Sequence, residues 1–332
     1  MTGINVSGWI ALTATGGLLG SQLIMGVISL YHESFEPQRW QQFLIYIGYT
    51  LIALLVNTFL TRLLPVITQA AFIWSVLGFV VISITVLACA SPNYQSASFV
   101  YGEFLNTTGW PNGLAWLLGL LQGALSLTGF DAVAHMIEEI PEPHLKGPNI
   151  VIYCILIGMF TGWVFLSCLL FVLTDVDDVI ESAAGPLLEI FYQATNNRAG
   201  SVCLLMFPLG CLLFATIGIM STSSRMTYAF ARDRGLPFSR VFAKVHPKLD
   251  TPVNALLLTT VLVVIFGCIF LGSTAAFNAI VSASVVALGV SYAIPPAINI
   301  CRGRKMLPET RAFKLPEWLG WFCNIVSSLS NI

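Results

Sequence analysis

Charged residues are scarce in this sequence. Only 9% of its 332 residues are Asp, Glu, Lys or Arg, whereas a soluble domain carries about 25%. Hydrophobic residues make up 56% of the chain, and the mean hydropathy is +0.83. This balance excludes an ordinary soluble domain and indicates an integral membrane protein surrounded by a lipid bilayer. The formal net charge of −1 gives no sign of a nucleic-acid partner.

Metal-binding and catalytic patterns are also scarce. The chain has four histidines, and its eight cysteines never form CxxC pairs or metal-ligand spacings. Cysteines within apolar runs are typical of small buried side chains, so we predict no metal and no cofactor. We also find no cluster of His, Asp or Ser typical of a membrane enzyme and no repeated filter or charged ring typical of a channel. We therefore expect neither an enzyme nor a pore.

Long apolar runs fill most of the chain. A membrane-spanning helix needs about 20 predominantly apolar residues, and eight complete runs meet this length. A ninth begins near residue 315 and reaches the last residue, 332. We treat residues 1–332 as one transmembrane domain with predicted spans at residues 8–30, 41–61, 65–90, 113–137, 149–173, 201–228, 253–271 and 275–300.

The distribution of basic residues predicts the orientation of these spans. With the N-terminus inside, 13 of the 15 Lys and Arg residues fall in inner loops or at inner helix ends, and only Arg39 and Arg198 fall outside. Positively charged loops stay on the cytoplasmic side. The plasma membrane is the favoured location for this multi-pass protein.

Two features of the predicted outer loops fit this orientation. Asn106-Thr-Thr is a glycosylation acceptor pattern, which is usable only on the outer side. The loop after residue 173 carries an apolar helical pattern that begins at Pro186. It predicts a short helix across the outer mouth, which could act as a gate or serve only as an interfacial packing element.

The stretch from residue 127 to residue 136 is the most unusual part of the chain. It places Gly129, Asp131 and His135 where an uninterrupted membrane helix should carry aliphatic side chains. An ionisable group at this depth costs about 2.5–3.5 kcal/mol and usually marks a substrate or ion path. Irregular backbone at this depth is tolerated only where it lines a cavity or is buried in protein. The stretch therefore predicts a binding site inside a transporter.

Asp131 and His135 are four residues apart and so share a helix face. They could carry a coupling proton, or they could simply pair with each other and cap the end of the helix. Small and hydroxyl residues in two other spans also have two interpretations. Gly16 and Gly17 could leave room for a ligand or let helices approach closely, and Ser221 and Thr222 could bind a substrate or bond back to their own helix.

Several motifs together resemble one family of transporters. The sequence resembles the amino acid permeases of the amino acid, polyamine and organocation superfamily, and within it the fungal amino acid, choline and 4-aminobutyrate permeases. The motifs that carry the likeness are Thr128-Gly-Phe-Asp131, Glu138-Glu139 with Pro141, the segment from Arg225 to Pro237, Thr251-Pro252, Trp110-Pro111 and Leu121-Gln122.

The resemblance implies a fold and a function. The fold would be an all-α, leucine-transporter-like bundle of two inverted five-helix repeats, present here in part. The function would be secondary active transport of an amino acid or a related amine such as choline or 4-aminobutyrate, with a proton as the favoured coupling ion. Thr128, Gly129, Phe130 and Asp131 would lie at the break of the family's sixth helix. The ring of Phe130 would close over an ammonium group.

The resemblance also implies a departure from the family. Aligned by its motifs, the chain begins at the third span of the family and stops inside the eleventh. The first broken helix, which supplies half of the expected binding site, has no counterpart. The alternative to a transporter is therefore a truncated, non-transporting remnant of such a permease.

Overall fold

The computed structural model describes residues 2–32, 34–125, 129–137, 140–305, 307, 311 and 313–330. Within this part of the chain the secondary structure is helical, apart from one isolated bridge between His246 and Thr251. The helices are α1 (Thr2–Tyr31), α2 (Arg39–Phe59), the short 3₁₀ helix η1 (Thr61–Leu63), α3 (Leu64–Ala90), α4 (Ala97–Gly102), α5 (Asn112–Leu125), α6 (Ala132–His135), α7 (Pro143–Val172), α8 (Val176–Glu181), α9 (Pro186–Thr195), α10 (Arg198–Arg232), α11 (Ser239–Phe242), α12 (Val253–Gly272), α13 (Thr274–Cys301) and α14 (Glu317–Ser330).

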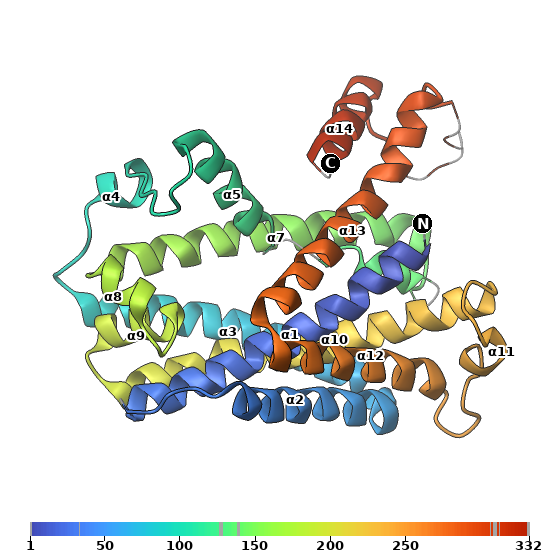
Figure 1. The fold of residues 1–332 in the computed structure, drawn as a ribbon. Coiled ribbons are helices and arrows are strands. Elements are labelled where there is room, and N and C mark those ends of the chain that lie inside the picture. The colour runs from blue at the N-terminus through green and yellow to red at the C-terminus, as the bar shows by residue number, and fades with distance from the viewer. Residues whose placement is uncertain are drawn as a thin grey trace.

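Helix α1 lies at the centre of the bundle (Figure 1). It packs against α2, α10, α12 and α13. Its side chains Trp9, Ala14 and Leu18 belong to the main apolar core, together with Tyr46 of α2 and Val263 of α12. A second core lies between α3, α9 and α10, around side chains such as Val86, Leu188, Phe191 and Leu205. The molecule is therefore an all-α bundle organised around one buried helix.

The outward faces of α3 and α7 are apolar. Exposed side chains such as Val80 and Ile84 of α3, and Phe160 and Trp163 of α7, have nothing to bury them in the single chain. Such faces belong against lipid, because hydrocarbon chains are as apolar as these side chains. Seven helices among the described residues are long and apolar enough to span a membrane. They are α1, α2, α3 together with η1, α7, α10, α12 and α13.

The predicted span at residues 113–137 is not one continuous helix. Helix α5 ends at Leu125, and residues 129–131 form a turn before the single-turn helix α6. Gly129 has a φ of +93°, which a right-handed helix cannot contain and which glycine adopts most readily.

Other boundaries also differ from the predicted ranges. Helix α7 begins at Pro143, before the predicted residue 149, because proline fits the first position of a helix. Helix α14 has 14 residues, which is too short to span a bilayer. Helix α9 forms the predicted short outer helix, and its side chains Leu188, Phe191 and Ala194 are buried.

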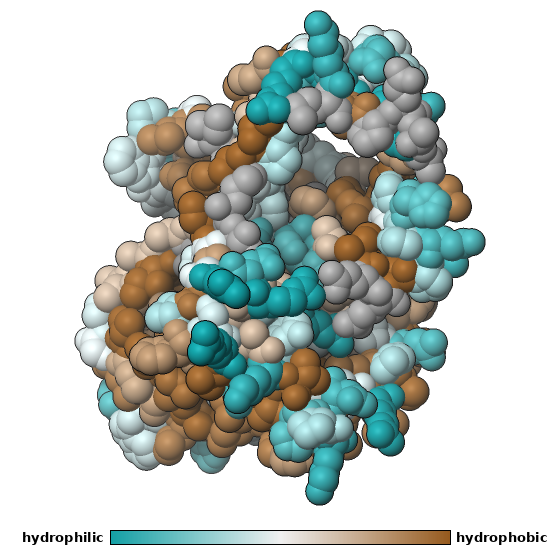
Figure 2. Space-filling view, turned by 90° about the vertical axis from the view of Figure 1, so that its right-hand side faces the viewer, coloured by the Kyte–Doolittle hydropathy of each residue, from teal (hydrophilic) through white to brown (hydrophobic). Residues whose placement is uncertain are grey.

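Hydrophilic side chains gather at the end of the molecule that carries the N-terminus and α11 (Figure 2). This end includes the last turn of α10 and the loop after it, where Arg232, Arg234, Arg240, Lys244 and Lys248 lie. It is the end predicted to face the cytoplasm. The opposite end carries α4, α8 and α9.

Candidate functional site

The interruption between α5 and α6 is built by three successive residues. Gly129 turns the chain, and its carbonyl accepts a hydrogen bond from the Ala132 amide at 3.1 Å. Asp131 is the residue before α6, yet its side chain does not cap that helix. The carboxylate is therefore left available for contacts with other elements. Thr128, which the sequence placed at the same break, lies outside the described residues.

Asp131 and His135 form a close pair. Nε2 of His135 lies 2.8 Å from Oδ2 of Asp131. The side chain of Asp131 is 10% exposed and that of His135 is 22% exposed. The imidazole edge also meets the ring of Trp9, with ring centroids 5.7 Å apart and planes at 87°. The sequence allowed Asp131 and His135 either to carry a proton or to pair with each other and cap the helix end. In the structure the two side chains pair, but the Asp131 side chain does not cap α6.

The second carboxylate oxygen of Asp131 has a different environment. Oδ1 is buried and has no hydrogen-bond partner. The hydroxyl of Tyr292, on α13, is buried and interacts with this carboxylate. The ring of Phe130 lies beside that of Tyr292, with centroids 5.7 Å apart. Because an unpaired buried polar group costs about 1–3 kcal/mol, the contact between the hydroxyl and the carboxylate lowers the cost of burying both.

A large cavity adjoins the interruption. This central cavity has a volume of about 1130 Å³ and lies between α1, α3, the 129–136 segment and α10. Four residues that the sequence singled out are in its wall, together with Arg225 near its inner end: Gly16, Gly129, Ser221 and Thr222. Asp131 is not in the wall, but its neighbours Gly129 and Ala132 are. The cavity therefore reaches the break beside Asp131 without including its carboxylate.

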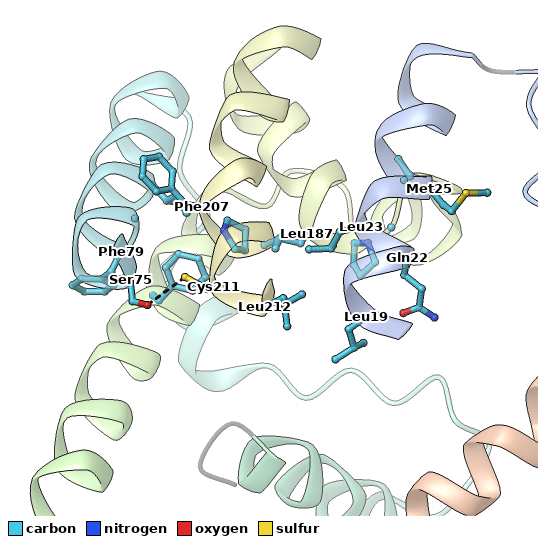
Figure 3. A pocket seen from close by; sticks show the side chains of 18 of the residues that line it. Leu19, Gln22, Leu23, Met25, Ser75, Phe79, Leu187, Phe207, Cys211 and Leu212 are labelled. Carbon is cyan, nitrogen blue, oxygen red and sulfur yellow. Dashed lines mark hydrogen bonds between the residues drawn. The ribbon is translucent and has the colours of Figure 1, made fainter. Parts of the chain in front are cut away.

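Two further cavities continue from the central one. The outer cavity, of about 900 Å³, lies between α1, α3, α7, α9 and α10 (Figure 3). Leu19 and Leu212 line both the outer and the central cavity, and Figure 3 shows them at the same end of the outer one. The inner cavity, of about 330 Å³, includes His135 and shares Ser221 and Arg225 with the central cavity. The three cavities together follow α10 from Phe207 to Arg232.

Not every residue singled out from the sequence faces this series of cavities. A side chain at Gly17 would meet the ring of Tyr46 on α2 at 3.0 Å, which agrees with the packing interpretation for this residue. The hydroxyl of Thr222 donates to the Gly218 carbonyl at 3.1 Å, within its own helix, and lies 3.8 Å from Sδ of Met136. Thr222 thus lines the cavity and bonds back to its helix at the same time.

Asn106 lies far from this site, in the loop between α4 and α5. Its Nδ2 donates to the Trp110 carbonyl at 2.7 Å and to Oδ1 of Asn112 at 2.9 Å. A glycan attached to this nitrogen would remove one of its two N–H bonds, so at least one of these hydrogen bonds would be lost. Glycosylation at Asn106 stays a prediction.

Sequence reasoning missed Tyr292. This residue lies within the apolar run at residues 275–300, where a tyrosine carries no special signal. Nothing in the sequence indicates that α13 crosses the break at this residue. Trp9 was missed for the same reason, because an aromatic residue in a membrane helix is usually part of the core.

Comparison with known proteins gives a consistent result. Residues 1–332 match the sequence model of the amino acid permease family. A relative from Macrophomina phaseolina, whose name describes an amino acid/polyamine transporter, is 33% identical over 97% of this chain and 73% of its own length. The choline transporter of Saccharomyces cerevisiae is 32% identical over 91% of this chain and 54% of its own length. The amino-acid permease BAT1 of Arabidopsis thaliana is 31% identical over 92% of this chain and 62% of its own length.

The chain thus spans about half to three quarters of the length of these relatives. The match to the family covers every residue, and it agrees with the apolar helices and the motifs from which the resemblance was drawn. The chain is a multi-pass membrane protein that belongs to the amino acid permease family.

Proposed function

We propose that this chain contributes the substrate-binding core of a secondary active transporter for amino acids or related amines, in the plasma membrane. The observation that carries the proposal is the position of Asp131. Its carboxylate is buried at a break in the bundle, next to a cavity large enough for a small molecule. A carboxylate in such a place usually serves a substrate or an ion.

The walls of the central cavity suit a small amphipathic substrate. Gly129 leaves room, while Ser221 and Thr222 bring polar groups to a lining that is otherwise largely apolar. Phe130 adds an aromatic face near the carboxylate, which can attract an ammonium group. Choline and 4-aminobutyrate are the first candidates, and the outer and inner cavities would be the two ends of the path.

We also propose that the coupling ion is a proton carried by the pair of Asp131 and His135. Histidine is the side-chain type that changes charge between pH 5 and 8, and here it contacts a buried carboxylate at 2.8 Å. Other ionisable groups near the pair are Tyr292 on α13, Arg225 and Tyr228 on α10, and Asp250 in the loop before α12. The inner cavity, which includes His135, gives the proton a way out toward the cytoplasmic end.

Uptake of labelled choline and 4-aminobutyrate by permease-deficient cells tests the function. Cells that express the chain should accumulate at least one of the two. Asp131→Asn should lower this uptake about ten-fold or more, because a hydrogen bond to a charged group is worth about 1.5–3 kcal/mol. The matched control is Asp178→Asn, an identical change on the exposed α8, which should leave uptake nearly unchanged. No uptake by the wild-type chain would favour the non-transporting remnant.

The pH dependence of the same uptake tests the coupling ion. Proton-coupled uptake should be faster at pH 5 outside than at pH 7.5, and Asp131→Asn should flatten this dependence in whatever uptake remains. If the variant kept the wild-type pH profile, Asp131 would have no role in proton coupling.

A further inference from the structure

We propose that residues 234–249, in the loop between α10 and α12, form a binding surface for acidic phospholipids of the inner leaflet. The exposed apolar side chains of this segment would enter the headgroup region, and its basic side chains would contact the lipid phosphates. Such a surface would hold the inner end of the molecule at the membrane whether or not the chain transports a substrate.

The first step is the charge of the segment. Residues 234–249 contain no Asp or Glu. Their four Lys and Arg side chains are all exposed: Arg234, Arg240, Lys244 and Lys248. None of the ion pairs in the described part of the chain includes any of these four cations. A basic cluster next to a membrane helix is attracted to acidic lipids, and each basic residue near the surface strengthens the binding about five-fold.

The second step is an aromatic side chain that the loop holds away from the protein. Phe238 is 80% exposed, and its φ of +58° lies in the left-handed region that bulky side chains rarely adopt. The loop around it is ordered by backbone hydrogen bonds, from the Val241 amide to the Phe238 carbonyl at 2.8 Å and from the Ala243 amide to the Ser239 carbonyl at 2.8 Å. The exposure of Phe238 is therefore set by the fold of the loop, which is a costly arrangement for an aromatic ring in water.

The third step is the depth of the segment in the membrane. Nδ2 of Asn254, in the first turn of α12, donates to the Val241 carbonyl of α11 at 2.8 Å. Leu257 and Val261 follow Asn254 by three and seven residues, so they lie on the same face of α12, and both are exposed. This face belongs against lipid, and α11 lies at its inner end (Figure 1). The segment is therefore at the level of the headgroups, where apolar side chains set among Lys and Arg are typical of membrane-binding surfaces.

Hydrogen–deuterium exchange of the purified full chain in lipid nanodiscs tests this surface. One set of nanodiscs contains phosphatidylcholine alone, and the other contains equal parts of phosphatidylcholine and phosphatidylserine. Both leaflets of a nanodisc carry the same lipids, so the result does not depend on the orientation of the chain. The amides of residues 234–249 should exchange about five-fold or more slowly with phosphatidylserine present. High salt should remove this difference, because it screens exposed charges.

Two variants separate the charged contacts from the apolar one. Arg240→Gln combined with Lys244→Gln should remove most of the difference between the two lipids, whereas Phe238→Ser should speed the exchange of the segment in both. The matched controls are Lys314→Gln, at an exposed lysine outside the segment, and Phe104→Ser, at an exposed phenylalanine in the loop after α4. Neither control should alter the exchange of residues 234–249.

Equal exchange in the two lipids by the wild-type chain would overturn the inference, and so would a lipid difference that survives in the double variant. Equal exchange in both lipids, with protection only when soluble polyglutamate is added, would identify an acidic polypeptide as the partner and would also overturn it.

Discussion

Glycine residues set how closely the helices around α1 approach one another. A side chain at Gly20 would lie 2.5 Å from Cζ of Tyr49, and one at Gly26 would overlap the Ala184 carbonyl. The tyrosine cannot easily retreat, because its hydroxyl donates to Leu209 on α10. Tyr46 is tied in the same way to the Val263 carbonyl at 2.6 Å. Small residues and tyrosine hydroxyls therefore hold α1, α2, α10 and α12 in one arrangement around the site.

Gly20→Ala should destabilise the protein by about 1–3 kcal/mol, the usual cost of inserting a methyl group into a packed interior. Either the methyl group strains the contact with Tyr49 or the tyrosine gives up its bond to Leu209. Thermal unfolding in detergent measures the effect. Gly48→Ala on α2, where an added Cβ meets nothing within 4 Å, is the control. If both variants unfolded at the same temperature, the proposed contact between α1 and α2 would be wrong.

At the scale of elements, the break between α5 and α6 decides where the site is. It brings Gly129 to the central cavity and Asp131 to α13 within three residues. The turn depends on one backbone angle, the φ of +93° at Gly129. In α10, by contrast, Gly218 lines the same cavity with an ordinary helical backbone.

Comparing Gly129→Ala with Gly218→Ala separates the effect of the positive φ at residue 129 from the effect of adding a methyl group to the cavity. Each variant adds one methyl group to the cavity wall, at a place where no atom lies within 4 Å. Only Gly129→Ala forces a side chain into the left-handed region, at a cost of about 1–2 kcal/mol. It should therefore lower both the unfolding temperature and amine binding, while Gly218→Ala should leave the unfolding temperature nearly unchanged. If both variants lowered the unfolding temperature equally, the positive φ at residue 129 would not be what makes a side chain unfavourable there.

The sequence predicted the elements better than it predicted their contacts. Apolar runs identify membrane helices by composition alone, so the all-α membrane fold was accessible, and a glycine beside Asp131 was enough to predict an interruption. The sequence could not show that a side chain would meet Thr216 of α10 at Gly16 and Tyr46 of α2 at Gly17, because these neighbours depend on which helices surround α1. Tyr292 was inaccessible for the same reason, since its partner comes from a distant part of the chain.

At the scale of the whole molecule, charge divides the two ends of the bundle. The end with α11 carries Arg234, Arg240, Lys244 and Lys248, and hydrophilic side chains cover it (Figure 2). The opposite end carries the acidic α8, where Asp175 accepts hydrogen bonds from the Asp177 and Asp178 amides. Such an asymmetry favours an orientation with the basic end in the cytoplasm.

Cysteine labelling in intact cells tests this orientation. Ser98→Cys and Asp178→Cys should react with a membrane-impermeant thiol reagent, above the background of the native cysteines, because both residues are exposed at the outer end. Lys244→Cys and Lys248→Cys, equally exposed at the basic end, should react only after the cells are permeabilised. The reverse pattern would place the outer cavity on the cytoplasmic side. It would also exclude glycosylation at Asn106, because the loop that carries this residue would then never meet the enzymes that attach glycans.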